Sequence, residues 1–253
     1  MTARTYDASP PSRQDPVDLV IFDCDGVLVD SERLCVQVDA RITAELGCPF
    51  TEAEIVETFV GCSYEVYTAA VEQRLGRRLA PDWLDAYEHL YLEAFEAGLT
   101  AVDGVADALA RLGPTPFCVA SNGRHQDIRR SLSLTSLDPH FDDSRIFSAS
   151  DVALGKPAPD LFLHAARSLG VPPERCAVVE DSPYGVRAAR AAGMRSFGYH
   201  GGLTKPERLA GPGTVLFDDM RALPALLGLR RAPADVPRPG RLTLAESAFE
   251  PRR

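Results

Sequence analysis

The stretch from Val17 to Ser31 reads V-D-L-V-I-F-D-C-D-G-V-L-V-D-S. Its first six residues form a short apolar, β-branched run, which is typical of a buried strand in a parallel sheet. Asp23 and Asp25 follow where this strand ends. Residues i and i+2 of an extended chain point to the same side, so the two carboxylates can share one site. Open α/β sheets bind ligands at the carboxyl ends of their strands, so the stretch predicts a functional site there.

The remainder of the chain alternates between short apolar runs and helical patterns. The further predicted strands are residues 116–120, 176–179, 195–199 and 214–217. The predicted helices between them are residues 105–111, 125–132, 159–169 and 184–192. This alternation is typical of an α/β fold with a doubly wound, mostly parallel, Rossmann-like sheet that carries helices on both faces.

One long segment interrupts this rhythm. Residues 31–100 contain four helical patterns, at 33–46, 52–59, 64–75 and 82–97, and no convincing strand. Seventy residues are too many for a simple strand-to-helix connection. We therefore expect a core made of residues 17–30 and 101–228, with residues 31–100 inserted as an all-helical cap. The proline-rich ends lack apolar periodicity, which predicts a disordered arm at 1–16 and a poorly ordered tail at 229–253.

Composition and charge exclude several classes of protein. The 253 residues are 45% hydrophobic and 25% charged, as expected for a globular protein with a buried core. The formal net charge of −9 disfavours a nucleic-acid binder, which needs a basic surface. No run approaches the roughly 18–20 apolar residues that span a membrane, and the polar N-terminus is unlike a secretory signal. Six scattered cysteines without a C-x-x-C pair indicate reduced thiols, so we expect a cytoplasmic protein without a membrane partner.

Two more motifs carry groups suited to binding a phosphate. Ser121-Asn122-Gly123 follows a predicted strand, where a hydroxyl and backbone N–H groups can bind phosphate oxygens, although the same residues also form ordinary turns and helix caps. Lys156 and Lys205 are the only lysines among 27 basic residues. The compact charge of Lys156, in Gly-Lys-Pro-Ala-Pro-Asp, suits a place where carboxylates and phosphate must both be neutralised. The alternative is an exposed loop lysine.

A second pair of acids follows the strand at 176–179. Glu180 and Asp181 end this strand as Asp23 ends the first, so the acids are expected in one crevice. A hard divalent cation with oxygen ligands would relieve their repulsion. Two alternatives remain at this point. Asp181 or Ser182 can cap the following helix, and D-x-D-G also occurs in calcium loops, although the helical flanks of such a loop are missing here.

In this order, the four motifs resemble those of the haloacid dehalogenase superfamily. Over residues 17–227 the chain is similar to its phosphatases and β-phosphoglucomutase-like members, which carry a helical cap after the first motif. The segments F-D-C-D-G and C-V-A-S-N-G most resemble the 6-phosphogluconate phosphatase-like branch. The resemblance implies a Mg²⁺-dependent phosphatase that hydrolyses a small phosphorylated metabolite, namely a sugar or sugar-acid phosphate.

The resemblance also implies a role for each motif residue. Asp23 would attack phosphorus and form an aspartyl-phosphate, and Asp25 would act as general acid and then general base. Mg²⁺ would be held by Asp23, the Asp25 backbone carbonyl and Asp181, with Glu180 bound directly or through water. The phosphate would be bound by Ser121, Asn122 and Lys156, and the substrate would meet the cap at Gly61, Ser63 and Tyr64.

Departures from the family pattern bear on the alternatives. A phosphosugar mutase or phosphotransferase is disfavoured, because β-phosphoglucomutases carry a His and an Arg in the cap where this chain has Cys35 and Tyr64. Haloacid dehalogenases need no metal and lack the second aspartate, here Asp25. A non-catalytic binding module would require neither Asp25 nor Lys156. The sequence contains no indication of the oligomeric state.

Overall fold

The computed structural model describes residues 16–60 and 64–229, so the predicted arm and tail lie outside the described residues except for Pro16 and Leu229. Six strands form one parallel sheet in the order β3-β2-β1-β4-β5-β6. Their bounds are β1 Leu19–Phe22, β2 Phe117–Ser121, β3 Ile146–Ser148, β4 Cys176–Glu180, β5 Arg195–Tyr199 and β6 Thr214–Phe217. The strand order reverses between β1 and β4, where such sheets bind ligands. The prediction of a doubly wound parallel α/β fold is confirmed.

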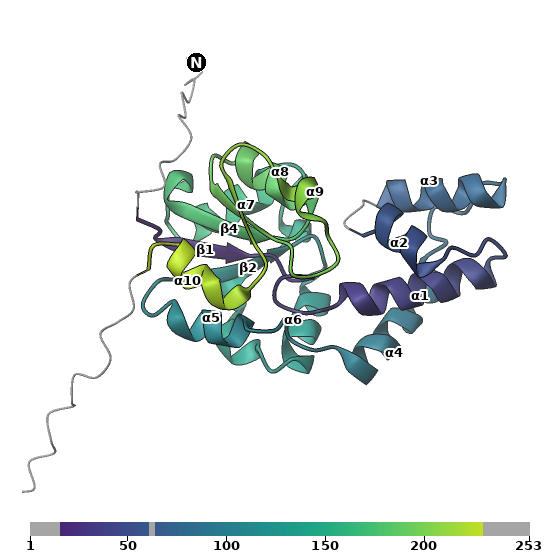
Figure 1. The fold of residues 1–253 in the computed structure, drawn as a ribbon, viewed down its shortest axis with the longest axis horizontal. Helices are drawn as coiled ribbons and strands as arrows, with labels where there is room; N and C mark the ends of the chain where they lie inside the picture. The colour runs from purple at the N-terminus through teal and green to yellow at the C-terminus, as the bar shows by residue number, and fades with distance from the viewer. Residues whose placement is uncertain (1–15, 61–63, 230–253) are drawn as a thin grey trace, which may run out of the picture.

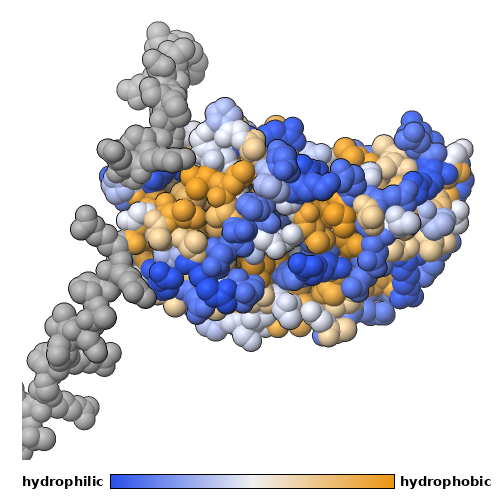
Figure 2. Space-filling view, in the orientation of Figure 1, coloured by the Kyte–Doolittle hydropathy of each residue, from blue (hydrophilic) through white to orange (hydrophobic). Residues whose placement is uncertain are grey.

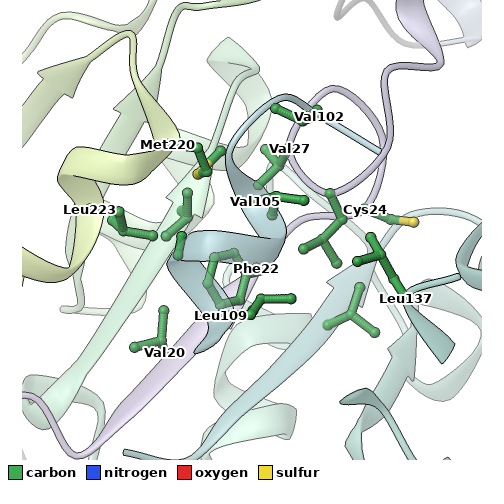
Figure 3. Packing of buried hydrophobic residues seen from close by; sticks show 14 of the residues in the cluster. Val20, Phe22, Cys24, Val27, Val102, Val105, Leu109, Leu137, Met220 and Leu223 are labelled. Atoms are coloured by element: carbon green, nitrogen blue, oxygen red, sulfur yellow. The ribbon is translucent and has the colours of Figure 1, made fainter. Parts of the chain in front are cut away.

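Helices cover both faces of this sheet (Figure 1). Alternate residues of β1 point to opposite faces. Val20 and Phe22 therefore pack with α5 (Val105–Arg111), α6 (His125–Leu134) and α10 (Leu223–Leu226), and Figure 3 shows part of this cluster. Leu19 and Ile21 pack on the other side with α7 (Asp160–Ser168) and α8 (Pro183–Ala191). Burial on both faces explains why the strands are almost continuously apolar.

Strand β3 was not predicted from the sequence. It has three residues and lies at the edge of the sheet, where it pairs with β2 so that Ser148 stands opposite Ser121. A run of three residues is too short to show a period. The strand nevertheless supports the loop after β2, because the hydroxyl of Ser148 donates to the carbonyl oxygen of Gly123 at 2.6 Å.

In the described part of the chain, helices α1 to α4 form a second lobe beside the α/β lobe (Figure 1). They are α1 (Glu32–Glu45), α2 (Glu52–Thr58), α3 (Tyr64–Leu75) and α4 (Glu88–Gly98). This helical lobe has its own buried cluster, which includes Ile42, Ile55, Val71 and Trp83. The predicted helix at 82–97 begins only at Glu88. Residues 85–87 form a tight 3₁₀ turn instead, next to the buried Trp83, whose indole N–H donates to Thr68 at 3.1 Å.

Two chain segments connect the lobes side by side. Val29 and Ala101 form an antiparallel bridge. The backbone N–H of Asp30 donates to Thr100 at 2.9 Å, and that of Val102 donates to Leu28 at 3.0 Å. The entry to the helical lobe and the exit from it therefore form one short hydrogen-bonded ribbon.

Charged residues also link the lobes beyond this ribbon. Lys205 of the α/β lobe pairs with Glu57 of α2 at 2.7 Å, beside α9 (Pro206–Leu209). Arg124 and Arg130 of the α/β lobe pair with Glu88 and Glu96 of α4. In each of these pairs the cation belongs to the α/β lobe and the carboxylate to the helical lobe.

The hydropathy of the surface and the state of the cysteines can be compared with what the composition predicts. On the face shown in Figure 2, apolar residues gather over the α/β lobe and near the junction of the lobes, and hydrophilic residues cover most of the rest. Within residues 16–60 and 64–229, no helix combines the length and the apolar character needed to cross a membrane. The five cysteines in the described part of the chain are all free, as predicted, and four of them are buried.

Candidate active site

The ends of three neighbouring strands converge on one pocket of about 250 Å³. Asp23 follows β1, Ser121 ends β2 and Glu180 ends β4. Because the strands are parallel, their carboxyl ends meet at the same edge of the sheet. The described lining residues are Asp23, Asp25, Glu32, Ser121, Asn122, Gly123, Lys156, Glu180, Asp181, Ser182 and Tyr184. The structure thus brings together all the predicted site residues of the α/β lobe.

Lys156 is the central cation of this pocket. Its Nζ lies 2.6 Å from Asp23 Oδ1 and 2.6 Å from Glu180 Oε1, and its side chain is almost fully buried. The alternative of an exposed loop lysine is therefore wrong. Asn122 fixes the loop that carries Lys156, since its amide accepts from the Lys156 N–H at 2.9 Å and donates to the Lys156 carbonyl at 3.2 Å.

Three buried carboxylates form a cluster suited to a cation. One oxygen from each of Asp23, Glu180 and Asp181 lies within 4.8 Å of the others. Two glycines allow this approach. A Cβ on Gly26 would lie 1.9 Å from Asp181 Oδ2, and one on Gly185 would lie 1.8 Å from Glu180 Oε1. Any side chain at these glycines would displace a carboxylate of the cluster.

The pKa values of the cluster reflect burial first and then an excess of acids over bases. Burial raises the pKa of Asp23 to about 7, against the opposing effect of Lys156. Burial also raises the pKa of Asp181 well above its ordinary value, and the nearby charges of Glu32 and Glu180 act in the same direction. Burial alone would lower the pKa of Lys156, but the carboxylates of Asp23 and Glu180 outweigh it and raise that pKa. One lysine does not neutralise this set of carboxylates, so the pocket favours a further cation.

Asp25 lines the pocket and is more exposed than its neighbours in the chain. Its Oδ1 accepts a hydrogen bond from the hydroxyl of Ser31 at 2.8 Å. Loss of solvent around the carboxyl group raises the pKa of Asp25, and the hydrogen bond from Ser31 lowers it. The turn through Gly26, whose N–H donates to the Val29 carbonyl at 2.8 Å, brings Ser31 back to Asp25.

At the start of α8, one residue caps the helix and the residue before it belongs to the carboxylate cluster. Ser182 is the N-cap, because its Oγ accepts from the N–H of Gly185 at 3.0 Å. Glu180 Oε2 in turn accepts from the N–H and the hydroxyl of Ser182, at 3.0 and 2.8 Å. Of the two capping candidates, Ser182 caps the helix and Asp181 faces the pocket instead.

Two lining residues were missed by the sequence analysis. Glu32 begins α1, and its carboxyl group lies close enough to that of Asp181 for each to affect the pKa of the other. Burial raises the pKa of Glu32 to about 6. Tyr184 lies in the first turn of α8. Glu32 directly follows Ser31 in the sequence. An acid in the first turn of a helix, however, ordinarily indicates only a favourable interaction with the helix dipole.

The predicted cap residues are not among the described residues that line the pocket. Gly61 and Ser63 lie outside the described residues. Tyr64 is 41% exposed at the start of α3, and its hydroxyl donates to the carbonyl of Pro81 within the helical lobe at 2.8 Å. Its contact with substrate stays a prediction. Cys35 lies close enough to Asp25 and Glu32 for their charges to act on its thiol, whose pKa burial raises well above the ordinary value.

Comparisons with known proteins agree with this geometry. A family model described as haloacid dehalogenase-like hydrolase matches residues 17–193. The 6-phosphogluconate phosphatase of Escherichia coli (strain K12) is 33% identical over 185 residues, which are 72% of this chain and 81% of that protein. A haloacid dehalogenase-like protein of unknown function from Agrobacterium tumefaciens str. C58 has a solved structure with 41% identity and a TM-score of 0.75, covering 84% of this chain and 98% of that one.

A second solved structure was determined with bound phosphate and sodium. It is a HAD family hydrolase from Deinococcus radiodurans R1, with 34% identity and a TM-score of 0.70, and the match covers 87% of this chain and 99% of that one. The family model spans more than half of the 253 residues. The four motifs, the pocket that they line and these matches together show that the chain is an enzyme of the haloacid dehalogenase-like hydrolase family.

Proposed function

We propose that this enzyme is a Mg²⁺-dependent phosphatase that hydrolyses a sugar or sugar-acid phosphate through an aspartyl-phosphate on Asp23. The observation that carries the proposal is the position of Lys156, buried between Asp23 and Glu180 in a pocket that also contains Asp25, Ser121 and Asn122. A nucleophilic carboxylate beside a fixed cation suits attack on a phosphate group.

The donor set fits Mg²⁺. Hard divalent cations prefer oxygen ligands, and Mg²⁺ takes few carboxylates and keeps several waters. Asp23, Asp181 and the backbone carbonyl of Asp25 would hold the ion. Both oxygens of Glu180 already accept hydrogen bonds, from Lys156 and Ser182, so we assign Glu180 a contact through water. When bound, the ion neutralises charge on the phosphoryl oxygens as a Lewis acid.

The reaction then proceeds in two balanced steps on the protein's own groups. A carboxylate oxygen of Asp23 attacks phosphorus, the phosphorus–oxygen bond to the substrate breaks, and the Asp25 carboxyl gives its proton to the leaving alkoxide. Water next attacks the aspartyl-phosphate while the Asp25 carboxylate takes a proton from that water. The bond between phosphorus and Asp23 breaks, which releases phosphate and restores both aspartates.

The other polar groups of the pocket bind the phosphoryl oxygens. Lys156 supplies a fixed positive charge, and Ser121 and Asn122 lie at the same edge of the sheet. In phosphoryl transfer, catalysis depends mainly on such positioning and charge stabilisation. The hydrogen bonds between Asn122 and the backbone of Lys156 hold these groups in a constant arrangement.

We further propose that residues 31–100 act as a cap on a catalytic core of residues 17–30 and 101–228. The separate hydrophobic cluster of the helical lobe and the ribbon at Val29 and Ala101 support this division. Closure of such a cap would exclude water and select substrate, with Gly61, Ser63 and Tyr64 as predicted contacts. Cys35 beside Asp25 is an uncharged thiol, which supports hydrolysis over transfer to a second phosphorylated sugar.

The test is a panel of phosphorylated metabolites, assayed for phosphate release with Mg²⁺ present. Similarity to a 6-phosphogluconate phosphatase makes sugar-acid phosphates the first members of the panel. We expect release of inorganic phosphate from at least one sugar or sugar-acid phosphate, and its absence in the Asp23→Asn protein. Transfer of the phosphate to a second hydroxyl in place of water would favour the mutase alternative.

A further inference from the structure

A second hollow lies beside the proposed active site and is unlike it in charge. It has a volume of about 420 Å³ and is lined by Arg187, Arg190, Arg208, Tyr184 and three uncharged residues. No carboxylate is among the described residues that line it. We call this feature the arginine hollow. In a chain with a net charge of −9, it is a local concentration of positive charge.

The three arginines are held mainly by uncharged oxygens, although the carboxylate of Glu57 lies near enough to Arg208 for their charges to interact. Arg190 donates to the hydroxyl of Thr214 and, at 2.7 Å, to the carbonyl of Leu209. Arg187 donates from Nε to the Pro183 carbonyl, and Arg208 donates from Nη1 to a backbone carbonyl of the helical lobe at 3.1 Å. Within residues 16–60 and 64–229, no ion pair involves these three arginines, although most other arginines there have one.

Arg187 and Arg208 therefore keep N–H donors for a ligand. The Nε of Arg187 is used within α8, and its guanidinium lies over the Tyr184 ring, 4.7 Å from the ring centroid. The contact of Arg208 uses one terminal nitrogen and leaves the other without a hydrogen bond to the described residues. Planar guanidinium groups match carboxylates through paired N–H donors.

Tyr184 connects the arginine hollow to the active-site pocket, because it lines both. Helix α8 begins at the pocket and carries Arg187 and Arg190 in its second and third turns. Figure 2 shows hydrophilic residues gathered over this part of the surface, where α8 and α9 approach the helical lobe. Tyr184 therefore stands between the two cavities, and a ligand that passed it from Asp23 would meet the arginines of the hollow.

The two cavities carry charges of opposite sign, since carboxylates predominate in the active-site pocket and arginines in the hollow. Among the described residues that line the active-site pocket, Lys156 is the single cation against five carboxylates, those of Asp23, Asp25, Glu32, Glu180 and Asp181. A carboxylate elsewhere in the substrate would be repelled by the acids that Mg²⁺ leaves unneutralised. An extended chain advances about 3.5 Å for every three bonds, so an acyclic six-carbon sugar acid reaches about 7 Å from its phosphate.

We propose that the arginine hollow binds the carboxylate of a sugar-acid phosphate whose phosphate lies at Asp23. Arg187 and Arg208 donate to the carboxylate, and Arg190 contributes fixed positive charge behind them. This inference rests on the proposed function and narrows its substrate class to phosphate esters with a second anionic group at the far end of the carbon chain.

The test measures ligand binding in the Asp23→Asn protein with Mg²⁺, so that the ligand is not consumed. Calorimetry compares gluconate 6-phosphate with glucitol 6-phosphate, which has an uncharged alcohol in place of the carboxylate. We expect gluconate 6-phosphate to bind about tenfold more tightly, the effect of one or two charge-assisted hydrogen bonds. Arg187→Gln and Arg208→Gln, each added to this protein, should remove the preference and leave the affinity for glucitol 6-phosphate within about twofold.

Arg167→Gln is the matched control. Arg167 is exposed on α7, away from the arginine hollow, and its loss removes the same charge from the protein. It should leave the preference for gluconate 6-phosphate intact. Arg187 makes no hydrogen bond to the described residues of the helical lobe, so its variant separates carboxylate binding from any effect of Arg208 on the cap.

Three results would overturn the inference. The first is equal affinity for the two ligands, and the second is a preference that survives Arg187→Gln. The third is tighter binding of a glucitol bisphosphate than of gluconate 6-phosphate, which would assign the hollow to a second phosphate. Failure of the proposed function would be seen in a different assay. The enzyme without substitutions would then release phosphate from neither ligand, while calorimetry could still measure the binding preference and its loss in the arginine variants.

Discussion

The carboxyl group of Asp39 allows a quantitative test of how the helical lobe is stabilised. Asp39 lies on α1, is 8% exposed, and accepts a hydrogen bond from the Tyr91 hydroxyl at 2.5 Å. Burial raises its pKa to about 6, although hydrogen bonds from Tyr91 and Tyr67 act in the opposite direction. Cys35 on the same helix also faces Asp39, and burial keeps its thiol neutral over the range of interest.

The sign and the size of the effect follow from this pKa. The folded protein binds the Asp39 proton more tightly than the unfolded chain, so the contribution to stability is greatest below pH 4 and is lost as the pH rises towards 6. The difference between about 6 and the ordinary value of 3.8, at 1.36 kcal/mol per pH unit, corresponds to about 3 kcal/mol. Above pH 7 the contribution is constant.

Asp39→Asn removes this titration. We compare the free energy of unfolding of the variant with that of the wild type. As the pH rises from 3.5 to 7, the variant should gain about 3 kcal/mol of stability relative to the wild type. Urea denaturation followed by tryptophan fluorescence measures this difference. Trp83 is the single tryptophan and lies in the same hydrophobic cluster, 5.5 Å from the Tyr67 ring, so its emission reports on this lobe.

Two further variants separate the explanation from its competitors. Tyr91→Phe removes a hydrogen-bond donor that favours the charged carboxylate, so it should destabilise the protein more at pH 7 than at pH 4. Glu93→Gln on the exposed face of α4 removes the same charge and should leave the pH profile as in the wild type. If the Asp39→Asn curve runs parallel to the wild-type curve from pH 3.5 to 7, buried Asp39 does not titrate as described and the reasoning is refuted.

The remaining predictions concern the active site and the cap. Asp23→Asn should lower phosphate release more than 100-fold while circular dichroism shows an unchanged fold, and a smaller loss would contradict the covalent mechanism. A chelator should abolish activity, Mg²⁺ should restore it and Ca²⁺ should restore it poorly, while Asp181→Ala should sharply raise the Mg²⁺ concentration needed. Lys156→Met leaves buried carboxylates without their cation, so thermal denaturation should show a loss of about 3–5 kcal/mol in the metal-free protein, and an unchanged melting temperature would speak against the buried bridge. Tyr64→Ala should change the relative kcat/KM among phosphorylated substrates, and an unaltered order of preference would restrict Tyr64 to its contact with Pro81.

The order of the elements could be predicted because their patterns are local. The apolar run before Asp23 is typical of a strand that is buried on both faces, and its repetition along the chain predicts a parallel sheet. Strand ends then bring Asp23, Ser121 and Glu180 to one edge without knowledge of any side-chain contact. Lys156 could be singled out because lysine is so rare in this chain.

Contacts between segments far apart in the chain could not be predicted in this way. The three-residue strand β3 exists because it pairs with β2, and the late start of α4 accompanies the burial of Trp83 against α3. Such interactions depend on the distance between side chains in space, and periodicity along the chain carries no information about that distance.

The same distinction applies to the active site and its surroundings. The sequence by itself predicted which residues would come together at the strand ends, because Asp23, Lys156 and Asp181 occur in motifs beside predicted strands, and all three line the pocket. Only the tertiary structure decided that Glu32 meets Asp181, and that arginines from two separate helices share a hollow next to the pocket. Each of these neighbours is brought into place by packing between elements, and the strength of a charge interaction depends on separation in space and on burial, which are properties of the folded chain alone.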